Sequence, residues 1–126
     1  MRSGETTSQT NANVVAEIVL APDAPTFSNA VLRVRISNVT YVGSAAPVMA
    51  DAELRNLSHH AGSESRWTLV LTVSHVDPSQ AYGASAHMNL AGDGRIAPSD
   101  YISMESHPVL TYGHPNRVII RLRRVE

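Results

Sequence analysis

Apolar and polar residues alternate along most of this chain. The pattern is clearest over residues 30–37 and 66–75, where every second side chain is aliphatic or aromatic and those between are mostly polar. Successive side chains of a β-strand point to opposite faces, so this period of two predicts strands with one buried and one exposed face. Less regular versions of the pattern predict further strands over residues 13–20, 82–90, 95–104 and 117–125.

Residues 48–57 carry two conflicting signals. The stretch around Ala50 and Glu53 is rich in helix-forming residues, yet Val48, Ala50, Ala52 and Leu54 also alternate at period two. We favour a strand, because every confidently assigned neighbour is a strand and agreement between local and global patterns is itself evidence.

Turn-forming residues separate these segments at regular intervals. Prolines, glycines, serines and aspartates cluster at 22–25, 43–47, 58–65, 77–80 and 92–94. About seven short strands at such spacing predict an all-β fold, a single-domain antiparallel β-sandwich. Residues 1–12 are polar and are expected to form a disordered lead-in, with the sandwich occupying residues 13–126.

Composition excludes several classes of function. A net charge of −1 argues against a nucleic-acid partner, which usually selects a basic surplus. The chain has no cysteine, and hence no thiol nucleophile or thiolate metal site. No apolar run approaches the roughly 18 residues of a membrane span. As written, the chain has no export signal and would be cytoplasmic; a missing export or lipidation segment would make it periplasmic or outer-membrane-associated.

The residues of catalytic and metal sites are present but not arranged for chemistry. None of the six histidines has the i,i+2 spacing of strand-borne zinc ligands, so we expect exposed loop histidines. There is no Gly-x-Ser-x-Gly motif, and Asp51, Glu53, Asp93 and Asp100 are expected on solvated surface or in turns. We therefore predict no catalytic residue, no metal, no cofactor and no enzyme activity.

Arginine supplies the candidate binding residues. Arg33 and Arg35 fall on one face of a predicted strand, and Arg117, Arg121 and Arg123 share a face of another. If these strands were neighbours, the five would form an exposed basic stripe for docking an acidic partner. The alternative is a solvated sheet face whose charges resist edge pairing. Trp67 lies on the apolar side of its strand and is expected in the core.

Short motifs follow one another over about residues 14–125, in the segments 18–24, 36–39, 76–82, 84–86, 92–95, 98–100, 108–113 and 118–122. The order of these motifs resembles that of the YbaY/YscW-type family of small bacterial lipoproteins. The resemblance implies a compact β-sandwich without catalytic residues, and one branch of the family resembles pilot proteins that chaperone secretins. The chain departs from the family in lacking a lipobox cysteine and an export signal, on which outer-membrane anchoring depends.

Two functions follow as hypotheses. The first is a chaperone-like module that binds another protein, such as a secretin-like segment, through an exposed face or a sheet edge, with residues 13–20 or 96–104 as candidate edges. Pro98 suits an edge strand. The alternative is a small-ligand or carbohydrate-binding module of the cell envelope. That module would need exposed aromatic side chains, which only the tyrosines supply: Tyr41, Tyr82, Tyr101 and Tyr112.

Overall fold

The described part of the chain consists of strands joined by turns and loops. The computed structural model describes residues 10–40, 46–90, 100–103 and 106–124, and within these ranges it contains no helix. The strands are β1 (Thr10–Leu20), β2 (Phe27–Asn38), β3 (Val48–His59), β4 (Ser65–Val76), β5 (Tyr82–Asn89), β6 (Tyr101–Ile102), β7 (His107–Val109), β8 (Arg117–Arg121) and β9 (Arg123–Arg124).

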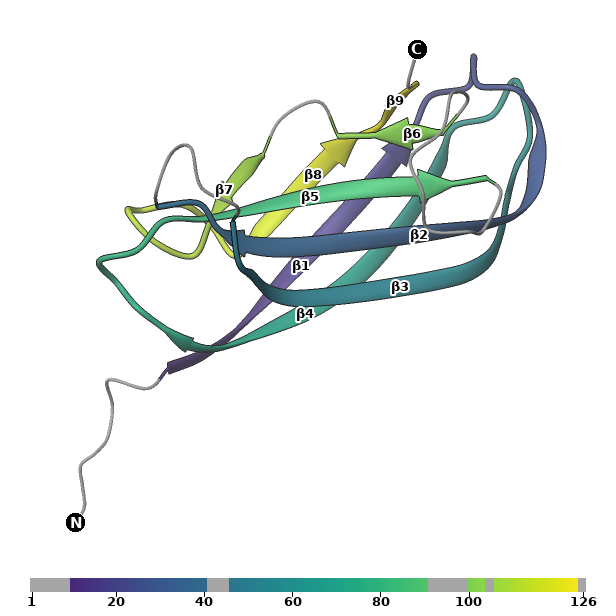
Figure 1. Cartoon of the computed structure of the whole chain (residues 1–126). Coiled ribbons are helices and arrows are strands. Elements are labelled where there is room, and N and C mark those ends of the chain that lie inside the picture. Colours follow the sequence, from purple (N-terminus) through teal and green to yellow (C-terminus); the bar gives the residue numbers. More distant parts are fainter. Residues whose placement is uncertain (1–9, 41–45, 91–99, 104–105, 125–126) are drawn as a thin grey trace.

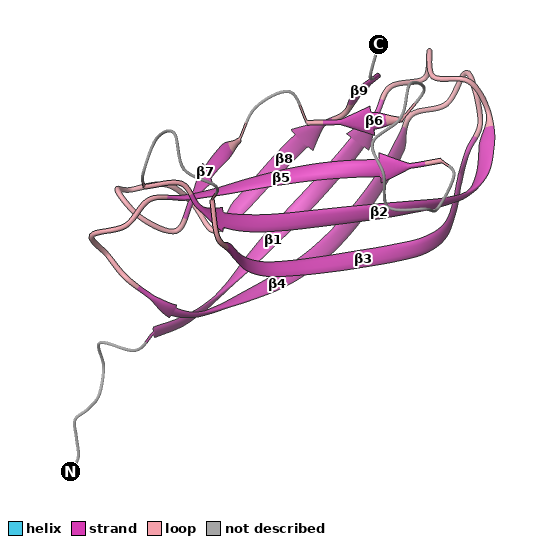
Figure 2. Cartoon of the chain, in the orientation of Figure 1, coloured by secondary structure: helices cyan, strands magenta, loops and turns pink. Residues whose placement is uncertain are grey.

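These strands form two packed sheets. The smaller sheet has the order β4-β1-β8, and the larger has the order β3-β2-β5-β6-β9, with β7 also paired to β5. Figures 1 and 2 show the long strands β2, β3 and β5 crossing obliquely over β1, β4 and β8. The predicted all-β sandwich is confirmed. One of its pairings, between β1 and β8, is parallel.

The core lies between the two sheets and follows the predicted alternation. Ile18, Leu32, Ile36 and Ile120 are fully buried, whereas the residues between them on the same strands are mostly half-buried or exposed. Burial of each such side chain stabilises the fold by about 1.5–3 kcal/mol. Trp67, expected in the core, is half-buried and packs against it.

Residues 48–57 lie in β3, as favoured, but with an irregularity that the pattern did not predict. Asn29 in β2 and Asn56 in β3 both have a φ of 60°, and the register between the strands shifts around each of them. An extra residue in one strand inverts the alternation beyond it. As a result Leu57 packs against the core and His59 is buried.

The expectation of exposed loop histidines is therefore wrong for His59, which is only 1% exposed. Its Nε2 lies 3.1 Å from the carbonyl of Ala24, which can only accept, so Nε2 carries the proton. Its Nδ1 then accepts from the Ser65 hydroxyl at 2.7 Å, and its ring stacks on Phe27. Three other histidines also lie in strands rather than loops: His75, His87 and His107.

Asp100 departs from expectation in the same way. It is 2% exposed, and its carboxylate accepts from the Leu90 amide at 2.9 Å and contacts His87 Nε2 at 3.0 Å. Its role is to hold the chain after β5, not to lie solvated in a turn. Asp93 and the expected hairpin tip at 92–94 lie outside the described residues.

Neither expected sheet edge is an edge where the structure describes it, and residues 96–99 and 104 lie outside the described residues. β1 lies in the middle of the smaller sheet, and β6 lies between β5 and β9. Pro98 and most of the expected lead-in fall outside the described residues, and β1 begins at Thr10. The strands with one paired side are β4 and β8 in the smaller sheet and β3, β9 and the short β7 in the larger one.

Candidate functional site

The five candidate arginines do not form one stripe. Arg33 and Arg35 lie on β2 of the larger sheet, Arg117 and Arg121 on β8 of the smaller sheet, and Arg123 on β9. Because β2 and β8 belong to different sheets, the condition for a continuous stripe is not met. The structure separates the arginines into a β2 pair and a C-terminal group.

The β2 pair is partly neutralised. Arg33 donates to Glu53 at 2.9 Å, and Glu53 also accepts from Arg55 at 3.0 Å. Burial would raise the pKa of the Glu53 carboxyl, but the bond from Arg33 and the charge of Arg55 outweigh it and lower that pKa. This face of the larger sheet therefore carries charges of both signs.

The C-terminal group is less neutralised. Glu17, in the middle of the smaller sheet, accepts from Arg66 at 2.7 Å and lies 4.0 Å from Arg117. The hydrogen bonds that Arg66 donates to Glu17 and Glu64 raise the pKa of its guanidinium. Arg121 makes no ion pair within the described ranges. Positive charge is therefore in excess along β8.

β8 also presents backbone groups that no strand of the described ranges pairs with. The amide of Val15 donates to the Asn116 carbonyl, and the amide of Leu122 donates to the Val19 carbonyl. In a parallel ladder alternate residues turn both backbone groups toward the same neighbour. The even-numbered residues from 116 to 122 therefore face β1. The N–H and C=O groups of Arg117, Ile119 and Arg121 face away from β1, and no described segment pairs with them.

The side chains of these three residues lie on the outer face. β8 alternates strictly between exposed and buried residues, and Ile119 is 49% exposed between the two arginines. We call residues 117–121, with this open backbone and outer face, the β8 edge. Ile119 was not among the predicted binding residues. The sequence could have indicated Ile119, because it is an aliphatic residue that alternates with arginines on the face of the strand expected to be exposed to solvent.

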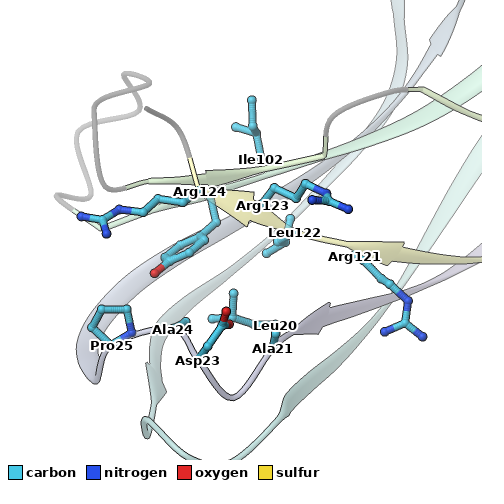
Figure 3. Close-up of a pocket in the computed structure, with 11 residues that line it drawn as sticks. Leu20, Ala21, Asp23, Ala24, Pro25, Ile102, Arg121, Leu122, Arg123 and Arg124 are labelled. Carbon is cyan, nitrogen blue, oxygen red and sulfur yellow. The ribbon is translucent and has the colours of Figure 1, made fainter.

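A pocket lies at the end of the sandwich where β8 gives way to β9. It has a volume of about 860 Å³, and its lining comes from the end of β1, the turn after it, β6 and residues 121–124. In Figure 3, Leu20, Leu122 and Asp23 point toward its centre, whereas the guanidinium groups of Arg121, Arg123 and Arg124 point in different directions. The three guanidinium groups therefore do not converge on one point, as a site for a single anion would require.

The tyrosines do not form a sugar-binding platform. Tyr82 and Tyr101 are 2% and 5% exposed, and burial raises the pKa of the Tyr101 hydroxyl. Tyr112 is exposed, and its hydroxyl donates to the Ser79 carbonyl at 2.6 Å. Tyr41 lies outside the described residues. The carbohydrate-binding hypothesis thus retains Tyr112 alone among the tyrosines that the structure describes.

No group of metal-ligating side chains appears in the described ranges. Nowhere in them do three side chains of the His, Cys, Asp and Glu types gather as a metal site would require. Nor do those ranges include a helix with the length and apolar character to cross a membrane.

Comparison with known proteins identifies a shared fold. No family model matches the chain, and no curated protein sequence does. Among solved structures, it is similar to an alternative pilotin from the type II secretion system of Vibrio cholerae, with a TM-score of 0.73 and 18% sequence identity. The match covers 93% of this chain and 99% of the pilotin chain, so the two share one architecture over nearly their full lengths.

Proposed function

We propose that this chain is a non-catalytic protein-binding module with a pilot-like role: it binds a secretin and assists its delivery or assembly. The observation that carries the proposal is the match of the whole fold to a pilotin, in which almost every part of each chain is covered. The resemblance of its motif order to the YbaY/YscW-type family supports the same role.

The surface is consistent with binding a protein. β8 offers backbone groups for pairing, an exposed isoleucine and two arginines. Arginine is enriched among the residues that dominate binding energy at protein interfaces, and the fully buried core of an interface is more apolar than the rest of the surface. An open sheet edge adds main-chain hydrogen bonds to an extended partner segment.

Deletion of the gene in its native host tests the role. The readout is the amount of secretin multimer in the outer-membrane fraction, compared with a strain in which the gene is restored. We expect multimer to fall severalfold and to recover on restoration. Secretin multimers of normal amount and location in the deletion strain would refute the pilot-like role.

A binding experiment tests the proposal without cells. The soluble chain is used as bait for a secretin encoded in the same genome, with a variant carrying Arg117→Glu and Arg121→Glu as the matched bait. We expect the secretin to be recovered by the parent chain and reduced for the variant. Recovery of no secretin by the parent chain counts against the proposal.

A further inference from the structure

We propose that the β8 edge receives an extended, acidic segment of a partner protein as a fourth strand of the smaller sheet. The segment carries an aliphatic side chain opposite Ile119 and carboxylates opposite Arg117 and Arg121. This inference rests on the proposed function and deepens it, because it names the docking surface and the chemistry of the partner segment.

The other sheet ends are less suited to adding a strand. β9 has two residues, and β7 has three, one of which is Pro108. β3 has a bulge at Asn56 and outward charges of both signs, features that protect an edge from pairing. β4 is joined to β3 by a short loop and contacts it. The backbone of β4 is also irregular at His75, where φ is 58°. β8 has no positive φ and no proline.

The charges on β8 indicate which partner fits. In an antiparallel pairing of two copies about Ile119, Arg117 of each copy would face Arg121 of the other. Like charges directly opposite each other destabilise a strand pair. An antiparallel segment with Glu or Asp at those two positions replaces both repulsions with attractions. The acidic segment, and not a second copy of this chain, is therefore the favoured occupant.

The register of the added strand follows from the open backbone groups. In an antiparallel pair, residues of a hydrogen-bonded pair lie directly opposite and exchange both bonds. The partner residue opposite Ile119 therefore turns its own N–H toward β8, as do the two acidic residues that flank it at i−2 and i+2. The residues between them turn their N–H groups away.

Three synthetic peptides test this arrangement with the full chain. The parent peptide is acetylated and amidated SETVTES, in which the valine is placed opposite Ile119 and the two glutamates opposite the arginines. One derivative is N-methylated at the valine, whose N–H is required, and a control is N-methylated at the first threonine, whose N–H faces away. By calorimetry in low salt, we expect the valine derivative to bind at least tenfold more weakly than the parent and the control to bind within about threefold of it.

Any other ranking of the three peptides overturns the proposal, as does the absence of binding by the parent peptide at millimolar concentration. The charge requirement is tested separately. Arg121→Glu should weaken SETVTES at least fivefold and strengthen the charge-reversed peptide SRTVTRS. Arg35→Glu makes the same change of charge on the larger sheet and should alter neither affinity. Equal effects of the two substitutions would contradict a site at β8.

The two proposals fail in different ways. If deletion of the gene abolishes secretin multimers but the peptide ranking is not observed, the pilot-like role stands and the β8 edge is not its docking surface. If the ranking is observed but deletion leaves the secretin unaffected, the β8 edge binds acidic segments and the partner is not a secretin.

Discussion

The amide of Leu122 donates to the carbonyl of Val19 across 3.0 Å, and this bond ends the ladder between β1 and β8. Beyond it the chain leaves the smaller sheet and pairs as β9 with β6 of the larger sheet. Leu122 is 7% exposed, so its side chain packs at the point where the two sheets are joined. The position of the β8 edge depends on this junction.

Replacement of Leu122 by alanine should therefore destabilise the fold. Loss of a buried leucine side chain costs about 2–5 kcal/mol, and we expect the lower part of that range because the residue lies near the end of the core. Urea denaturation followed by the fluorescence of Trp67 measures the change. Ile119→Ala, three residues away and half exposed, should change stability by less than about 1 kcal/mol. Equal losses of stability in the two variants would contradict the packing of Leu122 at the junction of the sheets.

His59 should be essential for stability in a way that its neighbour is not. His59→Leu leaves the Ala24 carbonyl and the Ser65 hydroxyl without their partner, and an unsatisfied buried polar group costs about 1–3 kcal/mol. His60→Leu changes an exposed residue and should have little effect. Thermal unfolding of the two variants decides the matter. Indistinguishable melting temperatures would mean that His59 is not held as described.

A side chain at Gly83 should be costly while Ser106 is present. A Cβ added at Gly83 would overlap the Ser106 hydroxyl and lie 3.2 Å from the Ser106 Cβ. We expect Gly83→Ala to destabilise the fold by about 1–2 kcal/mol, as overpacking commonly does. The double variant with Ser106→Ala should regain part of that loss, whereas Ser106→Ala alone should be nearly neutral. Strict additivity in this cycle would argue against the contact.

Asp77 should make stability depend on acid pH. The Ser79 amide and hydroxyl both donate to its Oδ1, at 2.9 and 2.7 Å, and these bonds lower the pKa of the carboxyl despite some desolvation. Because the folded-state pKa lies below the unfolded value of about 3.9, the contribution is complete above that pH. It is lost as the pH falls through the folded-state pKa.

Asp77→Asn should accordingly be less stable than the parent at neutral pH, and the difference should disappear at the acid end of a pH series of denaturation curves. Asp51→Asn is the matched control, since Asp51 is exposed and makes no ion pair within the described residues. A gap between Asp77→Asn and the parent that stays constant down to the lowest pH would refute this account.

Much of the fold was predictable because the signal is local. A strand with one buried face shows alternating apolar and polar residues in the sequence. Residues 30–37 and 66–75 form strands with alternating burial, as predicted. Even residues 48–57 were assigned correctly from their neighbours. The limit of this reasoning is the bulge at Asn56, because one inserted residue inverts the later positions of β3 and buries His59, which was expected in an exposed loop.

The candidate site depends on information that is not local. Nothing near residues 117–121 indicates that β8 pairs in parallel with β1, or that β1 lies in the middle of its sheet. Strand order is set by contacts between residues far apart in the chain. The sequence therefore identified arginines that lie on β8 and β9, but it grouped them with β2 and missed Ile119 and the open backbone beside it.

Hydrogen exchange resolved to single amides tests the central claim most directly. In the free chain, the amides of Arg117, Ile119 and Arg121 should exchange rapidly, while those of Val118 and Ile120 should be protected by their bonds to β1. Saturation with the acidic peptide SETVTES should slow the first three at least tenfold and leave the other two protected. Unchanged exchange at residues 117, 119 and 121, or new protection confined to another strand, would contradict the account.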